Sequence, residues 1–199
     1  MKKLIFMLIS ILVFNSCENI TKKEVFRANS YDNYSKESST SLEYARKNDL
    51  STDFYFIVDL SKPSGRDRFY VWDFKKNKIV RSFLVMNGRK SEPDKNNVRR
   101  YSNTPRSNQS SLGKYKISKN KVPSINYKYK YLLYGLEDSN DMALMRGIVL
   151  HPSKHVPNRE VYPRKIGKSL GCPSVSQGAF KVIDEKLQST DKNVLLLIV

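Results

Sequence analysis

The sequence predicts a mainly β domain with one principal α-helix near its C-terminal end. Tyrosine and phenylalanine are abundant, at 12 and 9 residues, and aromatic side chains favour strands. Short apolar runs bounded by turn residues recur along the chain, which is the pattern of strands. Residues 176–187 combine a serine start with apolar residues at helical spacing. A length of 199 residues with 39% hydrophobic content fits one domain with a tail.

Seven segments are expected to form strands, because apolar, aromatic and β-branched residues dominate each of them. They are residues 53–60, 68–74, 78–86, 111–117, 129–136, 147–150 and 194–199. Short turns join the first three, so the body opens as a β-meander. The last segment holds six apolar residues, which are too few to cross a membrane and indicate a core strand.

Polar segments separate these strands. Residues 87–110 form a long polar loop, and a loop of that length inside a compact domain is either functional or a disordered insertion. It leads to Gly113, where the backbone can come close to another group. Residues 119–128 form a second, basic loop, and residues 140–146 are long enough for one helical turn.

The first residues carry an export signal. Two lysines precede an apolar run, residues 4–14, that is too short for a membrane span and suits a signal peptide. The run leads to Ser16-Cys17, which resembles a bacterial lipobox. We therefore expect removal of residues 1–16, a lipid on Cys17, and a protein held on a membrane of the bacterial cell envelope. The alternative is an ordinary secretory signal with an incidental cysteine.

The segment after the signal is polar. Residues 18–50 show no sustained apolar period, so a flexible tether is expected over residues 17–52, with a short helix near residues 41–47. The folded domain is then residues 53–199.

The chain is strongly basic, with a formal net charge of +17. Removing residues 1–16, which hold two lysines and no acidic residue, leaves +15. Such charge indicates either a plain soluble surface or a polyanionic neighbour: nucleic acid, an acidic polymer or an anionic membrane. The sequence has no zinc-ligand spacing, no helix-turn-helix pattern and no aromatic RNA-binding motif, and its front end directs export. No nucleic-acid partner is therefore expected.

Cysteine and histidine are rare in this chain, and Cys172 lies in the same stretch of sequence as both histidines. The two cysteines are Cys17 and Cys172, which could form a disulfide, but a lipid on Cys17 would leave Cys172 as a lone and reactive thiol. A thiol near an imidazole can act as a thiolate nucleophile. Of the two histidines, His151 follows a strand and His155 lies in a loop, so His151 is the preferred base. A backbone carbonyl, from Pro152 or elsewhere in the connector, would orient it.

A tight turn, residues 169–173, contains the cysteine. Gly171 allows the turn to close and can direct the N–H groups of Gly171 and Cys172 toward one point, where they would stabilise an oxyanion. The alternative interpretation is purely structural, because a lone cysteine is often a small buried apolar residue and a histidine at a strand end often packs.

The motifs Val149-Leu150-His151 and Ser169-Leu170-Gly171-Cys172 resemble those of the YkuD-type L,D-transpeptidases, in the branch called the murein L,D-transpeptidase catalytic domain family. Segments 57–74, 107–117, 147–156 and 167–176 resemble the same branch in the same order. Three positions depart from the commoner family pattern. They are Pro152 after the histidine, Leu170 in place of a second histidine, and Ser174 in place of arginine or asparagine.

The resemblance implies a β-sandwich catalytic domain with Cys172 and His151 facing a cleft. The thiolate would attack a peptidoglycan tetrapeptide stem at its diaminopimelate or lysine residue, D-alanine would leave, and an amine of a second stem would take the acyl group in a 3→3 cross-link. Water as acceptor would give an L,D-carboxypeptidase, and a protein lysine would anchor that protein to the wall. A third alternative is a non-catalytic lipoprotein that binds the wall.

The resemblance also implies roles for further residues. Ser169 and Gly171 correspond to turn and oxyanion elements. Five residues match the segment that borders the donor cleft: Asn108, Gln109, Ser110, Ser111 and Gly113. No metal or cofactor is implied, and we expect a monomer whose partners are peptidoglycan stems and, through the lipid, a membrane.

Overall fold

The computed structural model describes residues 22–199. The expected signal peptide and the lipid on Cys17 lie outside the described residues. The helices are α1 (Lys22–Lys47) and α2 (Gln177–Gln188), with short 3-10 turns η1 (Arg89–Ser91) and η2 (Asp141–Ala143). The strands are β1 (Phe54–Val58), β2 (Phe69–Asp73), β3 (Lys78–Phe83), β4 (Val85–Met86), β5 (Gly113–Ile117), β6 (Val122–Ser124), β7 (Lys128–Gly135), β8 (Val149–Pro152), β9 (Ser174–Val175) and β10 (Val194–Ile198).

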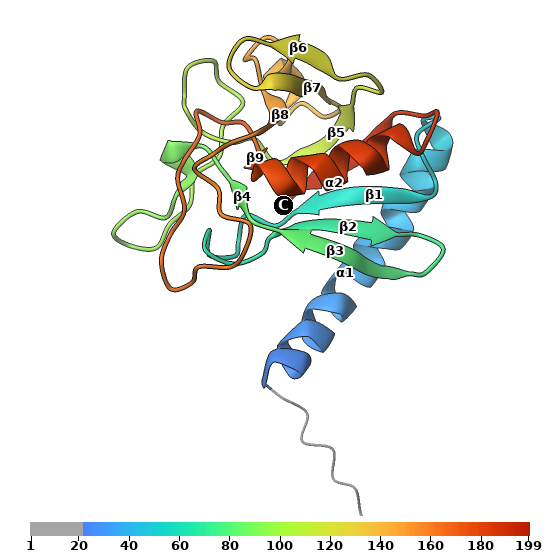
Figure 1. The fold of residues 1–199 in the computed structure, drawn as a ribbon, viewed down its shortest axis with the longest axis horizontal. Helices are drawn as coiled ribbons and strands as arrows, with labels where there is room; N and C mark the ends of the chain where they lie inside the picture. The colour runs from blue at the N-terminus through green and yellow to red at the C-terminus, as the bar shows by residue number, and fades with distance from the viewer. Residues whose placement is uncertain (1–21) are drawn as a thin grey trace, which may run out of the picture.

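The strands are hydrogen-bonded in the order β3-β2-β1-β10-β5-β7-β8-β9-β4, and β6 pairs with β7. The β1–β10 and β8–β9 pairs are parallel, and the other pairs are antiparallel. The sheet bends, so that β1–β3 and β6–β8 lie on opposite sides of α2 in Figure 1. A mainly β fold with its main helix after Cys172 is thereby confirmed. The sequence analysis missed the short strands β6 and β9.

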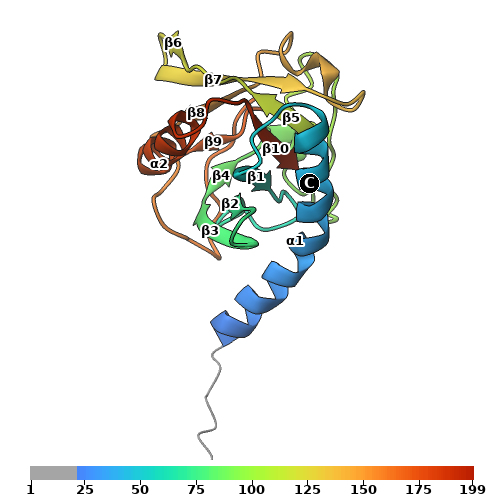
Figure 2. The same ribbon diagram turned by 90° about the vertical axis from the view of Figure 1, so that its right-hand side faces the viewer.

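The two central strands of the sheet, β1 and β10, bury both of their faces. Alternate residues of a strand point to opposite sides of a sheet. In β1, Phe56 belongs to the core that contains α2, whereas Tyr55 and Ile57 belong to a second core that contains α1. Figure 2 shows the consequence, with α2 and α1 on opposite sides of β1 and β2.

Helix α2 forms as its sequence predicts. The Ser176 hydroxyl caps the helix by accepting the Ala179 N–H at 3.1 Å. Phe180, Ile183 and Leu187 are buried at three- and four-residue spacing, and they anchor the helix on the sheet.

Helix α1 corrects one expectation. The flexible tether predicted over residues 17–52 is wrong for residues 22–40, which form one continuous helix with the short helix expected near residues 41–47. The buried side of its C-terminal half is built from small and hydroxyl-bearing residues at helical spacing, namely Tyr34, Ser38, Ser41 and Ala45. The pattern contains almost no large apolar residue, so a search for apolar periodicity does not detect it.

Polar contacts attach α1 to the sheet. The Tyr34 hydroxyl donates to the buried Asp59 carboxylate at 2.5 Å. The fully buried Tyr55 of β1 lies against the hydroxyls of Ser38 and Ser41. In the part of the chain that the structure describes, no helix is both long and apolar enough to span a bilayer.

Candidate active site

Strands β8 and β9 bring the candidate nucleophile and base into one place. His151 of β8 is the parallel partner of Ser174 of β9, and Cys172 lies two residues before Ser174. Residues 153–171 therefore leave the sheet after His151 and return beside it at Cys172. His151 and Cys172 are 21 residues apart in sequence, and the pairing of β8 with β9 brings their segments side by side.

His151 is held at both ring nitrogens. Its Nδ1 lies 2.9 Å from the Pro152 carbonyl, which can only accept, so Nδ1 carries the proton. Its Nε2 then accepts the Ser174 hydroxyl at 2.8 Å. The expected backbone acceptor is confirmed as Pro152. Burial lowers the pKa of His151, and the charge of Lys130 lowers it further, so the imidazole is a neutral base.

Tyr127 covers one face of this imidazole and was missed by the sequence analysis. The two rings stack with centroids 3.8 Å apart and planes inclined by 19°. Tyr127 lies between β6 and β7, in a segment that the sequence showed only as a basic loop. Burial raises the pKa of the Tyr127 phenol, and the charge of Cys172 raises it further. Tyr127 is therefore part of the surroundings of the candidate pair, with a direct contact to His151.

The Cys172 side chain is half-buried and packs against the core beneath α2. Its Sγ donates weakly to the Gly147 carbonyl at 3.6 Å. Burial raises the pKa of the Cys172 thiol, while the Val149 N–H and the positive charge of Arg146 act in the opposite direction. In the part of the chain that the structure describes, Sγ is bonded to the Gly147 carbonyl and Nε2 to the Ser174 hydroxyl, and no hydrogen bond joins Sγ to the imidazole.

The turn before Cys172 is shaped by two residues. Gly171 has a φ of +136°, and a Cβ there would lie 2.8 Å from Ile148 Cδ1. The Ser169 Oγ donates to the Cys172 carbonyl at 2.7 Å and accepts the Gly171 N–H at 3.1 Å. The sequence analysis expected the Gly171 N–H to stabilise an oxyanion. In the structure this N–H donates to the Ser169 Oγ instead. The Cys172 N–H lies beside its own sulfur.

Two of the five expected donor-cleft residues contact this turn. The Ser110 hydroxyl donates to the Gly171 carbonyl at 3.1 Å and accepts the Gly88 N–H at 3.0 Å. The Gln109 carbonyl oxygen lies 3.0 Å from the position of a Cβ on Gly171. These contacts place the end of the long polar loop against the cysteine turn.

The other three expected residues make their contacts with other parts of the fold. Asn108 has a positive φ of 58°, and its carbonyl accepts the Lys90 N–H at 3.1 Å. The Ser111 hydroxyl is paired with the Tyr115 hydroxyl at 2.6 Å. Gly113 opens β5 and is surrounded by the side chains of the 137–140 turn, so the structure does not bring it to Cys172.

Arg146 is a second residue that the sequence analysis missed. Its guanidinium donates four hydrogen bonds, of 2.5 to 3.4 Å, to Ser102 O, Ser107 Oγ, Gln109 O and Ser111 Oγ. These hydrogen bonds hold residues 102–111 in place. The positive charge of Arg146 also acts to lower the pKa of the Cys172 thiol, against the larger effect of burial. The available signal was a lone arginine immediately before the strand that carries His151.

His155 is exposed and lies in the connector, away from the strand position of His151. Among residues 22–199, no group of three or more His, Cys, Asp or Glu side chains is arranged to hold a metal ion. A cavity of about 420 Å³ lies between the β2–β3 hairpin and α2, lined by residues such as Val80 and Val182. None of the candidate catalytic residues lines it.

Three solved structures resemble this fold at low similarity. An L,D-transpeptidase from Xylanimonas cellulosilytica is 14% identical over 73% of this chain and 60% of that chain, with a TM-score of 0.40. A substituted form of the helical cell shape determining protein Pgp2 from Campylobacter jejuni is 13% identical over 81% and 53%, with a TM-score of 0.46. L,D-transpeptidase 1 from Mycobacterium tuberculosis is 10% identical over 74% and 61%, with a TM-score of 0.40.

The chain therefore spans between 53% and 61% of the length of these structures. No curated protein matches the sequence significantly. A family model described as the L,D-transpeptidase catalytic domain matches residues 26–196, which run from α1 into β10. This match covers most of the chain, so the protein belongs to the L,D-transpeptidase catalytic domain family.

Proposed function

We propose that this protein is a cysteine-dependent peptidoglycan L,D-transpeptidase that works through a thioester at Cys172. One observation carries the proposal. A neutral His151, with Nδ1 fixed on the Pro152 carbonyl, lies on the strand beside the one that begins two residues after Cys172. An oriented base beside a thiol is the arrangement that nucleophilic catalysis requires.

In the first half-reaction, His151 Nε2 takes the proton of Cys172 as the sulfur attacks the carbonyl carbon of the third stem residue. The S–C bond forms and the C–N bond to the terminal D-alanine breaks. His151 returns the proton to the leaving amine. In the second half-reaction, an amine of another stem attacks the thioester carbon and gives a proton to His151 Nε2. The C–S bond breaks, Cys172 leaves as the thiolate and takes the proton back from His151, and the new amide bond gives the 3→3 cross-link.

The resting contacts define what must change at the first step. The thiol donates to the Gly147 carbonyl, and the Ser174 hydroxyl occupies Nε2. Proton transfer therefore needs a rotation of the thiol away from Gly147 toward the imidazole. The Cys172 N–H, next to the sulfur, is the backbone donor best placed for the oxyanion.

We also propose that the mature chain begins at a lipidated Cys17 on an envelope membrane. The motif at Ser16-Cys17 and the apolar run before it support this location. Helix α1 would then carry the catalytic body away from the bilayer, since 26 helical residues span about 39 Å. A Cys17→Ala variant is expected to leave the membrane fraction, and an unchanged membrane association would contradict lipid attachment.

Muropeptide product analysis tests the proposed reaction. Purified wild-type protein is expected to convert tetrapeptide stems into 3→3 dimers with release of D-alanine, whereas Cys172→Ala forms no product. His155→Ala is the matched control and retains activity, because His155 is outside the pair. Shortened stems without dimers would identify water as the acceptor. Turnover that survives Cys172→Ala would refute the proposal.

A further inference from the structure

A buried serine hydroxyl occupies the nitrogen through which His151 would act as a base. Ser174 opens β9 and is fully buried, and its Oγ lies 2.8 Å from His151 Nε2. Because Nδ1 faces the Pro152 carbonyl and holds the ring proton, Nε2 offers only a lone pair, so the serine hydroxyl donates to it. A proton that reaches Nε2 must therefore displace this hydroxyl or pass through it.

The Ser174 hydroxyl has no second acceptor to which it could turn. Within residues 22–199, His151 Nε2 is the one hydrogen-bond partner of the Ser174 Oγ. The backbone of Ser174 is held as well, because it pairs with β8 on one side and with Met86 of β4 on the other. Turning the hydroxyl away would leave a buried donor unsatisfied, which is costly. Passing a proton along the existing hydrogen bond avoids that cost.

The thiol lies one step further along the same pair of segments. His151 and Ser174 are register partners, so two residues earlier on each segment Cys172 comes level with Val149. The contacts of Sγ agree with this position, since it lies 3.6 Å from the Gly147 carbonyl and beside the Val149 N–H. The residue before a proline is held extended, and residues two apart in an extended chain point to the same side. A thiol that turns from Gly147 toward the imidazole therefore meets the Ser174 hydroxyl.

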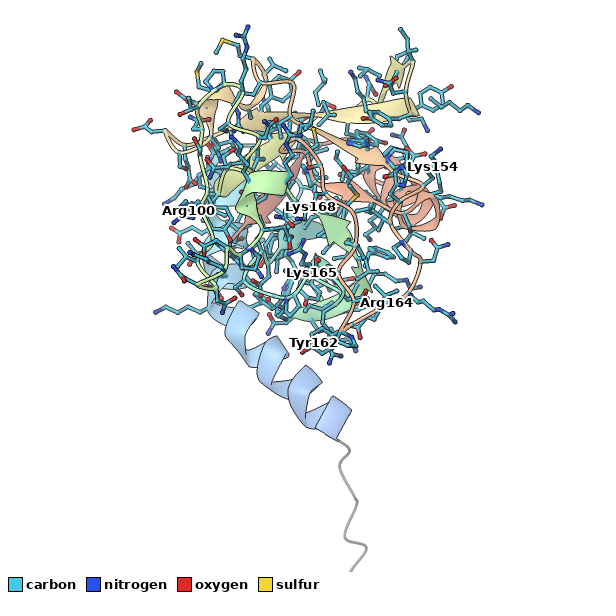
Figure 3. The ribbon with its side chains drawn as sticks, turned by 90° about the vertical axis from the view of Figure 1, so that its left-hand side faces the viewer. Arg100, Lys154, Tyr162, Arg164, Lys165 and Lys168 are labelled. Atoms are coloured by element: carbon cyan, nitrogen blue, oxygen red, sulfur yellow. The ribbon has the colours of Figure 1, made fainter. Side chains whose placement is uncertain are left out.

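The ionisable side chains around the pair do not bind Nε2. Tyr127 stacks on a face of the imidazole, whereas the lone pair of Nε2 lies in the ring plane. Lys130 and Arg146 act on the pair through their charge. The basic residues of the connector are exposed, and Figure 3 shows four of them on one outer face: Lys154, Arg164, Lys165 and Lys168. Among the described residues, Ser174 is the side chain that is hydrogen-bonded to Nε2.

We propose that Ser174 is a proton relay between the Cys172 thiol and His151, an inference that rests on the proposed thioester chemistry and deepens it. A serine hydroxyl can accept one hydrogen bond while it donates another. As the sulfur attacks, the thiol proton passes to the Ser174 Oγ and the serine proton passes to Nε2. Serine ends neutral and the imidazole carries the positive charge. The reverse shift, from Nε2 through the Ser174 Oγ, supplies the proton that the leaving amine takes.

Three variants of the full chain, purified in detergent, test the relay. Ser174→Ala removes the hydroxyl, and Ser174→Thr keeps it on a side chain that suits a strand. Ser41→Ala is the matched control, because it removes an equally buried hydroxyl from α1, on the other side of the sheet. Urea unfolding of each variant reports any loss of stability separately from the loss of reactivity.

The expected losses follow the hydroxyl. Alkylation of Cys172 at pH 7 should slow by roughly tenfold in Ser174→Ala, because the thiolate–imidazolium pair loses a hydrogen bond to a charged group. Release of D-alanine from a tetrapeptide stem in the first turnover should slow by roughly a hundredfold, as for loss of a general acid–base group. Ser174→Thr should recover most of both rates, and Ser41→Ala should keep both close to the wild type.

Mixtures of light and heavy water give a readout that a purely structural role would not change. When two protons move together, the rate of first-turnover D-alanine release depends on the deuterium fraction along a curve, whereas a single transferred proton gives a straight line. The wild type is expected to give the curve. If Ser174→Ala does not fold, this measurement on the wild type decides alone, and a straight line overturns the relay.

Two further results would overturn the relay. They are wild-type or faster alkylation in Ser174→Ala, and equal losses in Ser174→Ala and Ser174→Thr when both keep the stability of the wild type. His151→Ala distinguishes this failure from that of the proposed function. If His151→Ala slows both reactions and Ser174→Ala slows neither, the relay fails and the thioester chemistry stands. If the wild type releases no D-alanine, the proposed function fails, and alkylation still judges the relay.

Discussion

The two faces of the central sheet are covered by helices of opposite character. On one face, α2 buries Phe180, Ile183 and Leu187 in a core that reaches Cys172. On the other face, α1 packs through small residues and the buried hydrogen bond from Tyr34 to Asp59. The first interface is apolar and continuous with the candidate active site. The second sets small and hydroxyl-bearing residues of α1 against apolar and aromatic residues of the sheet, and its core contains none of the candidate catalytic residues.

This difference predicts which substitutions change stability alone and which also change the reactivity of Cys172. A change in the α2 core can reach Cys172 through direct packing, because close-packed interiors transmit displacement. A change in the α1 core must pass through the central strands β1 and β10 first. The α2 face should therefore couple folding to reactivity, whereas the α1 face should affect folding alone.

The largest expected effect in this comparison is on the α2 face. Ile183 is fully buried, so Ile183→Ala should lower the free energy of unfolding by about 2–5 kcal/mol through lost burial and a residual cavity. Urea unfolding measures this change. The exposed Lys181→Ala is the matched control and should stay within about 0.5 kcal/mol.

The same variant should also change the alkylation rate of Cys172 in the native state, because the thiol packs against the core that loses volume. A destabilised Ile183→Ala protein with wild-type thiol reactivity would break the link between this face and the site.

A smaller effect is expected on the α1 face. Ala45 is fully buried between α1 and the sheet, so Ala45→Leu should destabilise the fold by about 1–3 kcal/mol through overpacking. Ser39→Leu adds a similar side chain on the exposed side of the same helix and is expected to be near neutral. Thiol alkylation should stay at the wild-type rate in both. If Ala45→Leu leaves the free energy of unfolding unchanged, α1 is not packed on the sheet as described.

The same comparison explains what could be predicted from sequence. Helix α2 was predicted because a serine cap and three large apolar residues at helical spacing identify a helix locally. Helix α1 was missed before residue 41 because its contact surface is made mostly of small and hydroxyl-bearing residues, which look like tether residues until a partner surface is known. The long strands were predicted because their apolar runs are local signals, whereas β6 and β9 are short and exist through their partners.

The site divides in the same way. His151 and Cys172 were identified because each belongs to a rare residue type, and the Pro152 acceptor followed from adjacency. Tyr127 was missed because it reaches the site from a separate loop of the chain. Arg146 is near His151 in sequence, but its contacts with residues 102–111 and its effect on Cys172 arise only in the tertiary structure. The Gly171 N–H was assigned to an oxyanion because the sequence does not reveal that Ser169 folds back onto it.

The smallest expected effect concerns Arg146, which belongs to the candidate site and not to either helix interface. Its charge opposes the effect of burial, which raises the pKa of the Cys172 thiol. Removing the charge in Arg146→Met should therefore move the thiol pKa further upward and leave less thiolate at neutral pH. The rate of alkylation at pH 7 should fall by roughly fivefold, equivalent to about 1 kcal/mol for one charge near a solvated site.

The pH dependence of alkylation tests the direction of this change in the thiol pKa. In the wild type, the rate should rise with pH to an inflection above the ordinary cysteine range, and in Arg146→Met that inflection should lie higher still. Arg146→Lys keeps the charge and loses the planar fork that binds residues 102–111. It should restore the inflection, while the KM for stem peptides is expected to rise in both Arg146 variants because residues 102–111 lose the same hydrogen bonds. An unchanged inflection in Arg146→Met would confine Arg146 to holding the loop, and the charge on the thiol would then have no measurable role.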